Sequence, residues 1–176
     1  MLPDWYDTEF RNRRLADTAS VTIKEVFTMG KFFEDIEVGE KYSTPARTVT
    51  EADILGFAGL SGDFNAIHTD EVFCRQLGLP GRISHGLLTL SILTGLNERV
   101  GYTEGTILAF LGMNDLSYGK YVTPGDTIHA EVEVIGKRES SKPGRGIVTS
   151  LFTGANQDGD TVLDCEMVLM IRRRLE

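Results

Sequence analysis

The second half of the chain alternates apolar and polar residues, and this period of two limits the fold more than any other feature. In the stretch TIHAEVEV, residues 127–134, every second side chain is apolar and those between are polar. Such alternation is typical of a half-buried antiparallel strand. Comparable strands are predicted near 106–113 and twice within 147–171, around a turn at 156–160. A shorter strand within 41–50 is broken by Pro45.

One long apolar segment precedes these strands. Residues 84–100 carry seven large aliphatic side chains, too closely spaced for a single narrow stripe, which predicts a helix buried on most faces. Shorter helices are predicted after Thr50, which can cap a helix together with Asp53, and over 71–77. One helix and about five strands indicate an α+β protein in which a curved antiparallel sheet wraps the long helix.

The length and composition fit one soluble domain. The 176 residues divide into an irregular extension at 1–30 and a single domain at 31–176. A net charge of −8 argues against nucleic-acid binding, and local basic stretches such as 172–174 are more typical of solvated charge than of an anion site.

No targeting or anchoring segment is evident in the sequence. The longest apolar run, at 86–96, is too short to span a bilayer, and the first residues lack the features of a signal peptide. Cys74 and Cys165 form no CxxC pair, which argues against a disulfide framework or a thiolate zinc site. We therefore expect a cytoplasmic protein with no membrane partner.

The stretch LSGDFNAIHTD places an acid and an imidazole five positions apart. On a helix Asp63 and His68 would point roughly 140° apart, and on a strand they would face opposite sides, so only a turn can bring them together. Gly62 and Asn65 favour such a turn. The pair could then hold one water and move its proton, as hydration or dehydration requires. A surface turn with helix caps is the simpler alternative.

A second motif, RISHG, lies at the start of the long helix. Gly86 exposes a backbone N–H that lacks an intrahelical acceptor, and this group can stabilise a carbonyl oxygen that gains negative charge. Packing alone could also explain the glycine, and His85 could be a hydrogen-bonded core residue. Metal binding by Asp63, His68 and His85 is a further alternative, but without a defined ligand spacing no metal is expected.

Together, SGDFNAIHTD and RISHGLLTLSILTGL resemble the MaoC-like dehydratases, which include the (R)-specific enoyl-CoA hydratases. The resemblance extends from about Phe32 to the C-terminus and implies a hot-dog fold, with a thioester bound between two copies. Asp63 and His68 match the catalytic pair, and Gly86 matches the backbone donor of the oxyanion hole. Ala66 stands where the family usually has proline, which puts the loop geometry in doubt more than the activity.

The resemblance also implies the function. We expect reversible hydration of a trans-2-enoyl-CoA to an (R)-3-hydroxyacyl-CoA by a homodimer or higher homo-oligomer. Coenzyme A would enter as part of the substrate, with no other cofactor. Asn65 would shape the loop, and Ser84 and His85 would lie beside the substrate. Two alternatives stay open, namely a hot-dog thioesterase that attacks the carbonyl and a non-catalytic module that binds acyl-CoA.

Overall fold

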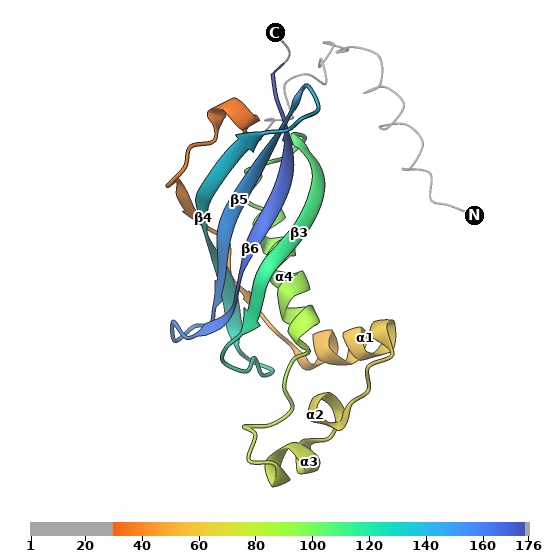
Figure 1. Cartoon of the computed structure of the whole chain (residues 1–176). Helices are drawn as coiled ribbons and strands as arrows, with labels where there is room; N and C mark the ends of the chain where they lie inside the picture. Colours follow the sequence, from red (N-terminus) through yellow and green to blue (C-terminus); the bar gives the residue numbers. More distant parts are fainter. Residues whose placement is uncertain (1–29, 175–176) are drawn as a thin grey trace, which may run out of the picture.

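The computed structural model describes residues 30–174, which form a curved antiparallel sheet along one side of a long helix (Figure 1). The strand order is β1-β4-β5-β6-β3, and the short β2 also pairs with β4. The strands are β1 Lys41–Ser43, β2 Arg47–Thr48, β3 Ile107–Tyr118, β4 Thr127–Glu139, β5 Arg145–Ala155 and β6 Thr161–Arg172. The predicted α+β class is confirmed. The predicted extension, apart from Gly30, lies outside the described residues.

Three short helices gather at one end of the sheet, and the long helix runs along its face (Figure 1). They are α1 Glu51–Ser61, α2 Ala66–Thr69, α3 Glu71–Gln76 and the long α4 Gly86–Glu98, with a 3-10 turn at Phe33–Asp35. The predicted cap of α1 is confirmed. The Thr50 hydroxyl accepts from the Asp53 N–H, while the Asp53 carboxylate accepts from the Thr50 N–H. Both bonds satisfy donors that a helix start leaves free.

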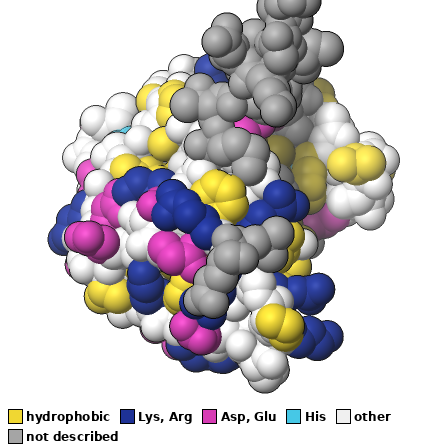
Figure 2. Space-filling view, turned by 90° about the horizontal axis from the view of Figure 1, so that it is seen from above, with side chains coloured by type: hydrophobic (Ala, Val, Ile, Leu, Met, Phe, Trp, Pro, Cys, Tyr) yellow, Lys and Arg dark blue, Asp and Glu magenta, His cyan; other side chains and the backbone are white. Residues whose placement is uncertain are grey.

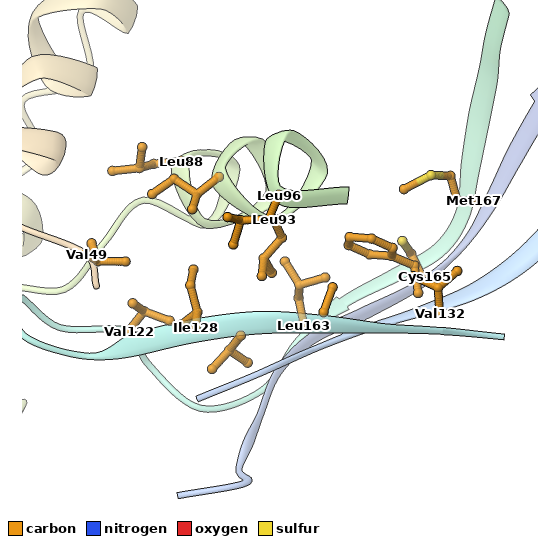
Figure 3. Close-up of a cluster of buried hydrophobic side chains, with 14 of the residues drawn as sticks. Val49, Leu88, Leu93, Leu96, Val122, Ile128, Val132, Leu163, Cys165 and Met167 are labelled. Carbon is orange, nitrogen blue, oxygen red and sulfur yellow. The ribbon is translucent and has the colours of Figure 1, made fainter. Parts of the chain in front are cut away.

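The main core lies between α4 and the sheet (Figure 3). On β4 the residues Ile128, Ala130, Val132 and Val134 are all buried, which confirms the predicted alternation. The first three meet Leu93 and its neighbours from α4, whereas Val134 belongs to a second cluster with Phe33 and Ile36. Each such aliphatic side chain, once fully buried, stabilises the fold by roughly 1.5–3 kcal/mol. The core thereby fixes the start of α4 against the strands.

The prediction that α4 is buried on most faces is wrong for one flank. Leu87 is 61% exposed, and Ser91 and Gly95 on the same side are also exposed. These positions follow each other at intervals of four, so they form one stripe along the helix. The sheet covers only the opposite side of α4, because its strands curve around a single face of the helix (Figure 1). The sequence pattern predicted an apolar helix, but it did not indicate that the sheet covers only one side of α4.

The register of β3 against β6 shifts at three places, and the third shift is a β-bulge between Asn114 and Ser117. Asn114 lies opposite Glu166 and Ser117 opposite Asp164, so β3 advances three residues while β6 advances two. The extra residue is Asp115, whose φ of +52° is the only positive value at a non-glycine position in the part of the chain that the structure describes. An extra residue reverses the alternation of a strand. The next alternate positions, 116 and 118, therefore face the helix side.

Charges of both signs lie side by side on the end of the molecule that Figure 2 shows. Arg173 pairs with Glu34 and Glu139, and Arg174 pairs with Asp35. The basic stretch at 172–174 is thus largely neutralised by neighbours, in agreement with the reading of solvated charge. Within residues 30–174, no helix combines the length and apolar character needed to cross a membrane.

Candidate active site

A tight turn brings Asp63 and His68 together. Gly62 caps the C-terminal end of α1 with a left-handed φ of +79°, and α2 begins three residues after Asp63. The Asn65 side chain accepts from the Ile67 N–H at 3.3 Å, and the Asn65 N–H donates to the Asp63 carboxylate at 3.2 Å. These bonds turn the chain so that Asp63 Oδ2 lies 3.9 Å from His68 Nε2. A single water can bridge that gap.

A backbone carbonyl fixes the tautomer of His68. The ring is buried, and its Nδ1 lies 2.8 Å from the Ile83 carbonyl oxygen. Because a carbonyl only accepts, Nδ1 must carry the hydrogen. In the neutral ring, Nε2 then holds a lone pair, and this is the atom that faces Asp63. The geometry therefore presents a proton acceptor toward the carboxylate.

His85 connects this loop to the start of α4. Its Nε2 lies 3.0 Å from the Asp63 carbonyl oxygen, and its ring stacks on His68 with centroids 3.7 Å apart. The ring of Phe57 packs on it at 5.0 Å. The Nδ1 atom of His85 is buried without a hydrogen-bond partner. The structure thus brings together the three residues Asp63, His68 and His85, with one ring nitrogen of each histidine and one carboxylate oxygen within 4.8 Å of one another.

Gly86 is the first residue of α4, and the ring of Tyr118 covers it. The Gly86 N–H has no acceptor within the helix, because it belongs to the first turn. A Cβ atom placed on Gly86 would lie 2.8 Å from the Tyr118 ring, well inside van der Waals contact. Ser84, just before, is buried and donates to the His85 carbonyl at 3.2 Å. Only glycine lets the strand approach the helix start this closely.

A cavity of about 670 Å³ adjoins these groups. Its wall includes His68 and Gly86, and the other side chains are mostly apolar. They comprise Ile67, Ile83, Leu87, Leu116, Tyr118, Tyr121, Val122 and Val162, with Ser84, Thr89, Gly119 and Lys120. Burial raises the pKa of the Tyr118 phenol, which therefore stays neutral at physiological pH. The cavity is suited to an apolar chain whose reactive end lies near His68 and Gly86.

Three features of this site have no counterpart among the predicted residues. The Ile83 carbonyl that orients His68 leaves no trace in a sequence, because every residue carries one. Tyr118 and Leu116 reach the cavity only through the bulge at Asp115, and the simple alternation of β3 would put their neighbours there instead. A positive φ at an aspartate is the one signal available, and aspartate is among the residues that tolerate it.

One long helix against a curved antiparallel sheet, with the turn of Asp63 and His68 beside the helix start, defines a hot-dog protein. The sequence profile of the MaoC like domain matches residues 34–156. The chain belongs to this MaoC-like family.

Known relatives include hydratases. The chain is 37% identical over 120 residues to the (R)-specific enoyl-CoA hydratase of Aeromonas caviae, covering 68% of this chain and 86% of the relative. It is 33% identical over 147 residues to mesaconyl-CoA hydratase of Cereibacter sphaeroides, covering 82% of this chain and 42% of the relative. The chain spans about two fifths of the length of such longer relatives.

A solved structure supports the fold independently. The monoamine oxidase regulatory protein from Archaeoglobus superposes with a TM-score of 0.77 at 36% identity. The match covers 83% of this chain and 97% of that one. The predicted hot-dog fold is confirmed.

Proposed function

We propose that this chain catalyses the reversible hydration of a trans-2-enoyl-CoA, or a related acyl thioester, to an (R)-3-hydroxyacyl-CoA. The observation that carries the proposal is the 3.9 Å separation of Asp63 Oδ2 and His68 Nε2 beside a cavity that the N–H end of α4 also borders. The names of the hydratase relatives support the same reaction class. No cofactor takes part, because coenzyme A arrives as part of the substrate.

The two acceptors define how a water would sit. Neutral His68 offers only a lone pair at Nε2, and ionised Asp63 also only accepts, so the water donates one hydrogen to each. Its own lone pair then points away from both groups and toward the substrate. Held within hydrogen-bond reach of two bases, the water is positioned for proton removal as it attacks.

The Gly86 N–H supplies the electrophilic half of the reaction. It donates to the thioester carbonyl oxygen and stabilises the negative charge that develops there, which makes the β-carbon electrophilic. The water oxygen bonds to the β-carbon, and one of its protons passes to Asp63 or His68. That proton then adds to the α-carbon on the same face. Dehydration is the same path in reverse.

Substitution of the two acceptors tests the proposal. Asp63→Asn and His68→Ala should each lower the rate of crotonyl-CoA hydration by about a hundredfold or more, as loss of a general acid–base group does. The matched controls are Asp70→Asn, which changes the acid that caps α3, and His129→Gln on β4, and both should keep the wild-type rate.

The assay follows enoyl absorbance and free thiol together. Loss of enoyl absorbance without thiol release supports a hydratase, whereas thiol release would indicate the thioesterase. Tight binding without turnover would indicate a non-catalytic module. Folded Asp63→Asn and His68→Ala variants that hydrate at the wild-type rate would refute the assignment.

The cavity favours an uncharged acyl tail. Lys120 is the only lysine or arginine among its lining residues in the described chain, and its side chain is 63% exposed and lies 3.5 Å from the Asp160 carboxylate. A second carboxylate on the substrate would be buried there without a dedicated partner, which is unfavourable. We therefore expect crotonyl-CoA to be hydrated in preference to mesaconyl-CoA, whose acyl group carries a second carboxylate.

We further propose that the chain acts as a homo-oligomer, at least a dimer. Strand β3 lies at the edge of the sheet, and Leu108 and Phe110 on it are exposed. An unpaired edge with apolar side chains readily joins a second copy. Phe110→Lys should shift the mass measured by light scattering toward the monomer.

We place the protein in the cytoplasm, because Cys74 and Cys165 are both free and buried.

A further inference from the structure

Three successive N–H groups hold residues 82–84, which lead from the turn after α3 into the start of α4. The second and third donate to backbone carbonyls, that of Ile67 at 3.0 Å and that of Val122 at 2.7 Å. The first, the Arg82 N–H, donates instead to the Glu71 carboxylate at 3.1 Å. Among these three acceptors only Glu71 belongs to a side chain, and the hydration scheme gives it no role.

The Glu71 carboxylate is itself held in place. Glu71 is the first residue of α3, and Arg75, one turn later, donates Nε–H to its Oε1 at 3.0 Å. A Cβ atom placed on Gly81 would lie 3.2 Å from the same oxygen, so the carboxylate packs directly against the main chain of the turn. The bond from the Arg82 N–H, followed by that from Arg75, lowers the pKa of Glu71, which is therefore ionised at neutral pH.

The segment that Glu71 holds carries the acceptor of the His68 ring. The Ile83 carbonyl, one residue after the Arg82 N–H, lies 2.8 Å from His68 Nδ1 and keeps the hydrogen on that nitrogen. A displacement of the main chain at 82–83 would weaken this bond. The hydrogen could then also reside on Nε2, which is the atom that must accept a proton from the water.

We propose that Glu71 is a positioning residue for His68. Its carboxylate ties the main chain at Arg82 to α3, so that the Ile83 carbonyl stays aimed at Nδ1. Without Glu71, water could satisfy the Arg82 N–H, but a water molecule is not attached to α3 and cannot hold the chain in position. The effect on catalysis rests on the proposed function, whereas the effect on the His68 tautomer does not.

The tautomer is measured first, without substrate. Long-range proton–nitrogen NMR correlations of the full chain distinguish Nδ1–H from Nε2–H at mildly alkaline pH, where neutral imidazole predominates. The spectrum of His68→Gln identifies the signals of His68 among the three histidines. We expect the Nδ1–H form in the wild type. In Glu71→Ala the Nε2–H form should gain population at its expense.

Two substitutions to glutamine separate the backbone contact from the loss of charge. Glu71→Gln keeps an oxygen that can accept from the Arg82 N–H, so it should retain more of the wild-type tautomer than Glu71→Ala does. Glu51→Gln is the matched control, because Glu51 pairs with the guanidinium of Arg82 and not with its N–H. This control should leave both the tautomer and the rate of hydration unchanged.

Activity is measured on the same samples. Glu71→Ala should lower kcat for crotonyl-CoA hydration by about tenfold or more and change KM little, because a small displacement of a group that acts in the reaction has such an effect. The side chain of Glu71 is 42% exposed, so the variant should fold, which circular dichroism verifies. Glu71→Asp keeps the charge but is too short to reach Arg82, and it provides a second test with the same expected result.

Each outcome has a defined meaning. Folded Glu71→Ala and Glu71→Asp proteins with the wild-type tautomer of His68 would overturn the proposal. A changed tautomer with an unchanged kcat would also overturn it, because Glu71 would then position nothing that the reaction needs. A changed tautomer in a protein whose wild type hydrates no enoyl-CoA would refute the proposed function and leave the contact between Glu71 and the His68 segment standing.

Discussion

Gly86→Ala tests the oxyanion role of the helix start most directly. A Cβ atom at this position would lie 2.8 Å from the Tyr118 ring, whereas ordinary contact begins at 3.4 Å. The ring or the first turn of α4 must therefore move by about 0.6 Å. A donor works within about 2.7–3.1 Å of the oxyanion, a range narrower than that movement. We expect the N–H to lose its position relative to the substrate carbonyl.

The expected loss is large. Removal of one oxyanion donor lowers kcat by about 10²–10³, equivalent to about 2.7–4 kcal/mol of transition-state stabilisation. Stopped-flow or steady-state hydration of crotonyl-CoA measures it, with thermal unfolding recorded on the same samples. Gly56→Ala is the matched control, because Gly56 lies within α1 with nothing inside 4 Å. It should keep the wild-type rate and gain about 0.5–1 kcal/mol in stability.

Combining Gly86→Ala with substitutions of Tyr118 separates the steric clash with the ring from other effects of the added methyl group. Tyr118→Ala removes the ring, so the additional loss caused by Gly86→Ala should shrink there. Tyr118→Phe keeps the ring and should leave that loss unchanged. A Gly86→Ala protein that hydrates crotonyl-CoA at the wild-type rate would refute the reasoning.

Three further predictions concern stability. Asp115→Gly should raise the free energy of unfolding in urea by about 1 kcal/mol, because it relieves a left-handed φ, and an unchanged midpoint would contradict this. Gly146→Ala should cost about 1–3 kcal/mol, because its Cβ would lie 2.0 Å from the Phe33 ring; an unaltered Tm would argue against it. Burial alone would raise the pKa of Asp53, but hydrogen bonds from Thr50 lower it below its ordinary value. Because the pKa of Asp53 is lower in the folded than in the unfolded protein, its ionised carboxylate stabilises the fold. This contribution is fully present above the unfolded pKa of about 3.9 and is lost as the pH falls through the folded pKa. The Tm difference between wild type and Asp53→Asn should therefore shrink from pH 7 to pH 3, and a constant difference would contradict the assignment.

The parts of the fold that the sequence predicts correctly depend on patterns among residues close together in the chain. Alternation located β4, and the turn at 156–160 located the hairpin between β5 and β6, because strand periodicity and turn residues act over a few positions. The capping pair at Thr50 and Asp53 is equally local. The sequence also required a turn between Asp63 and His68, and the structure has one.

The unpredicted parts depend on contacts between distant segments. Which flank of α4 stays open depends on where the sheet ends, and no helix-local pattern contains that information. The bulge at Asp115 changes which β3 side chains face the cavity, and it shows only in the register against β6. The neighbours of His85 come from α1, from α2 and from the turn between them, so its hydrogen bond and its stacking can be seen only in the folded chain.

The carbonyl of Ile83 that orients His68 belongs to the main chain, so amino-acid substitutions, natural or engineered, cannot remove it. A substitution at position 83 changes a buried side chain that lines the cavity, but it leaves in place the carbonyl that orients the imidazole. Side-chain mutagenesis cannot test the role of this carbonyl, because every amino acid carries one. An ester in place of the peptide bond that contains this carbonyl, introduced by chemical ligation, would weaken the acceptor and would test how far the main chain orients the His68 ring.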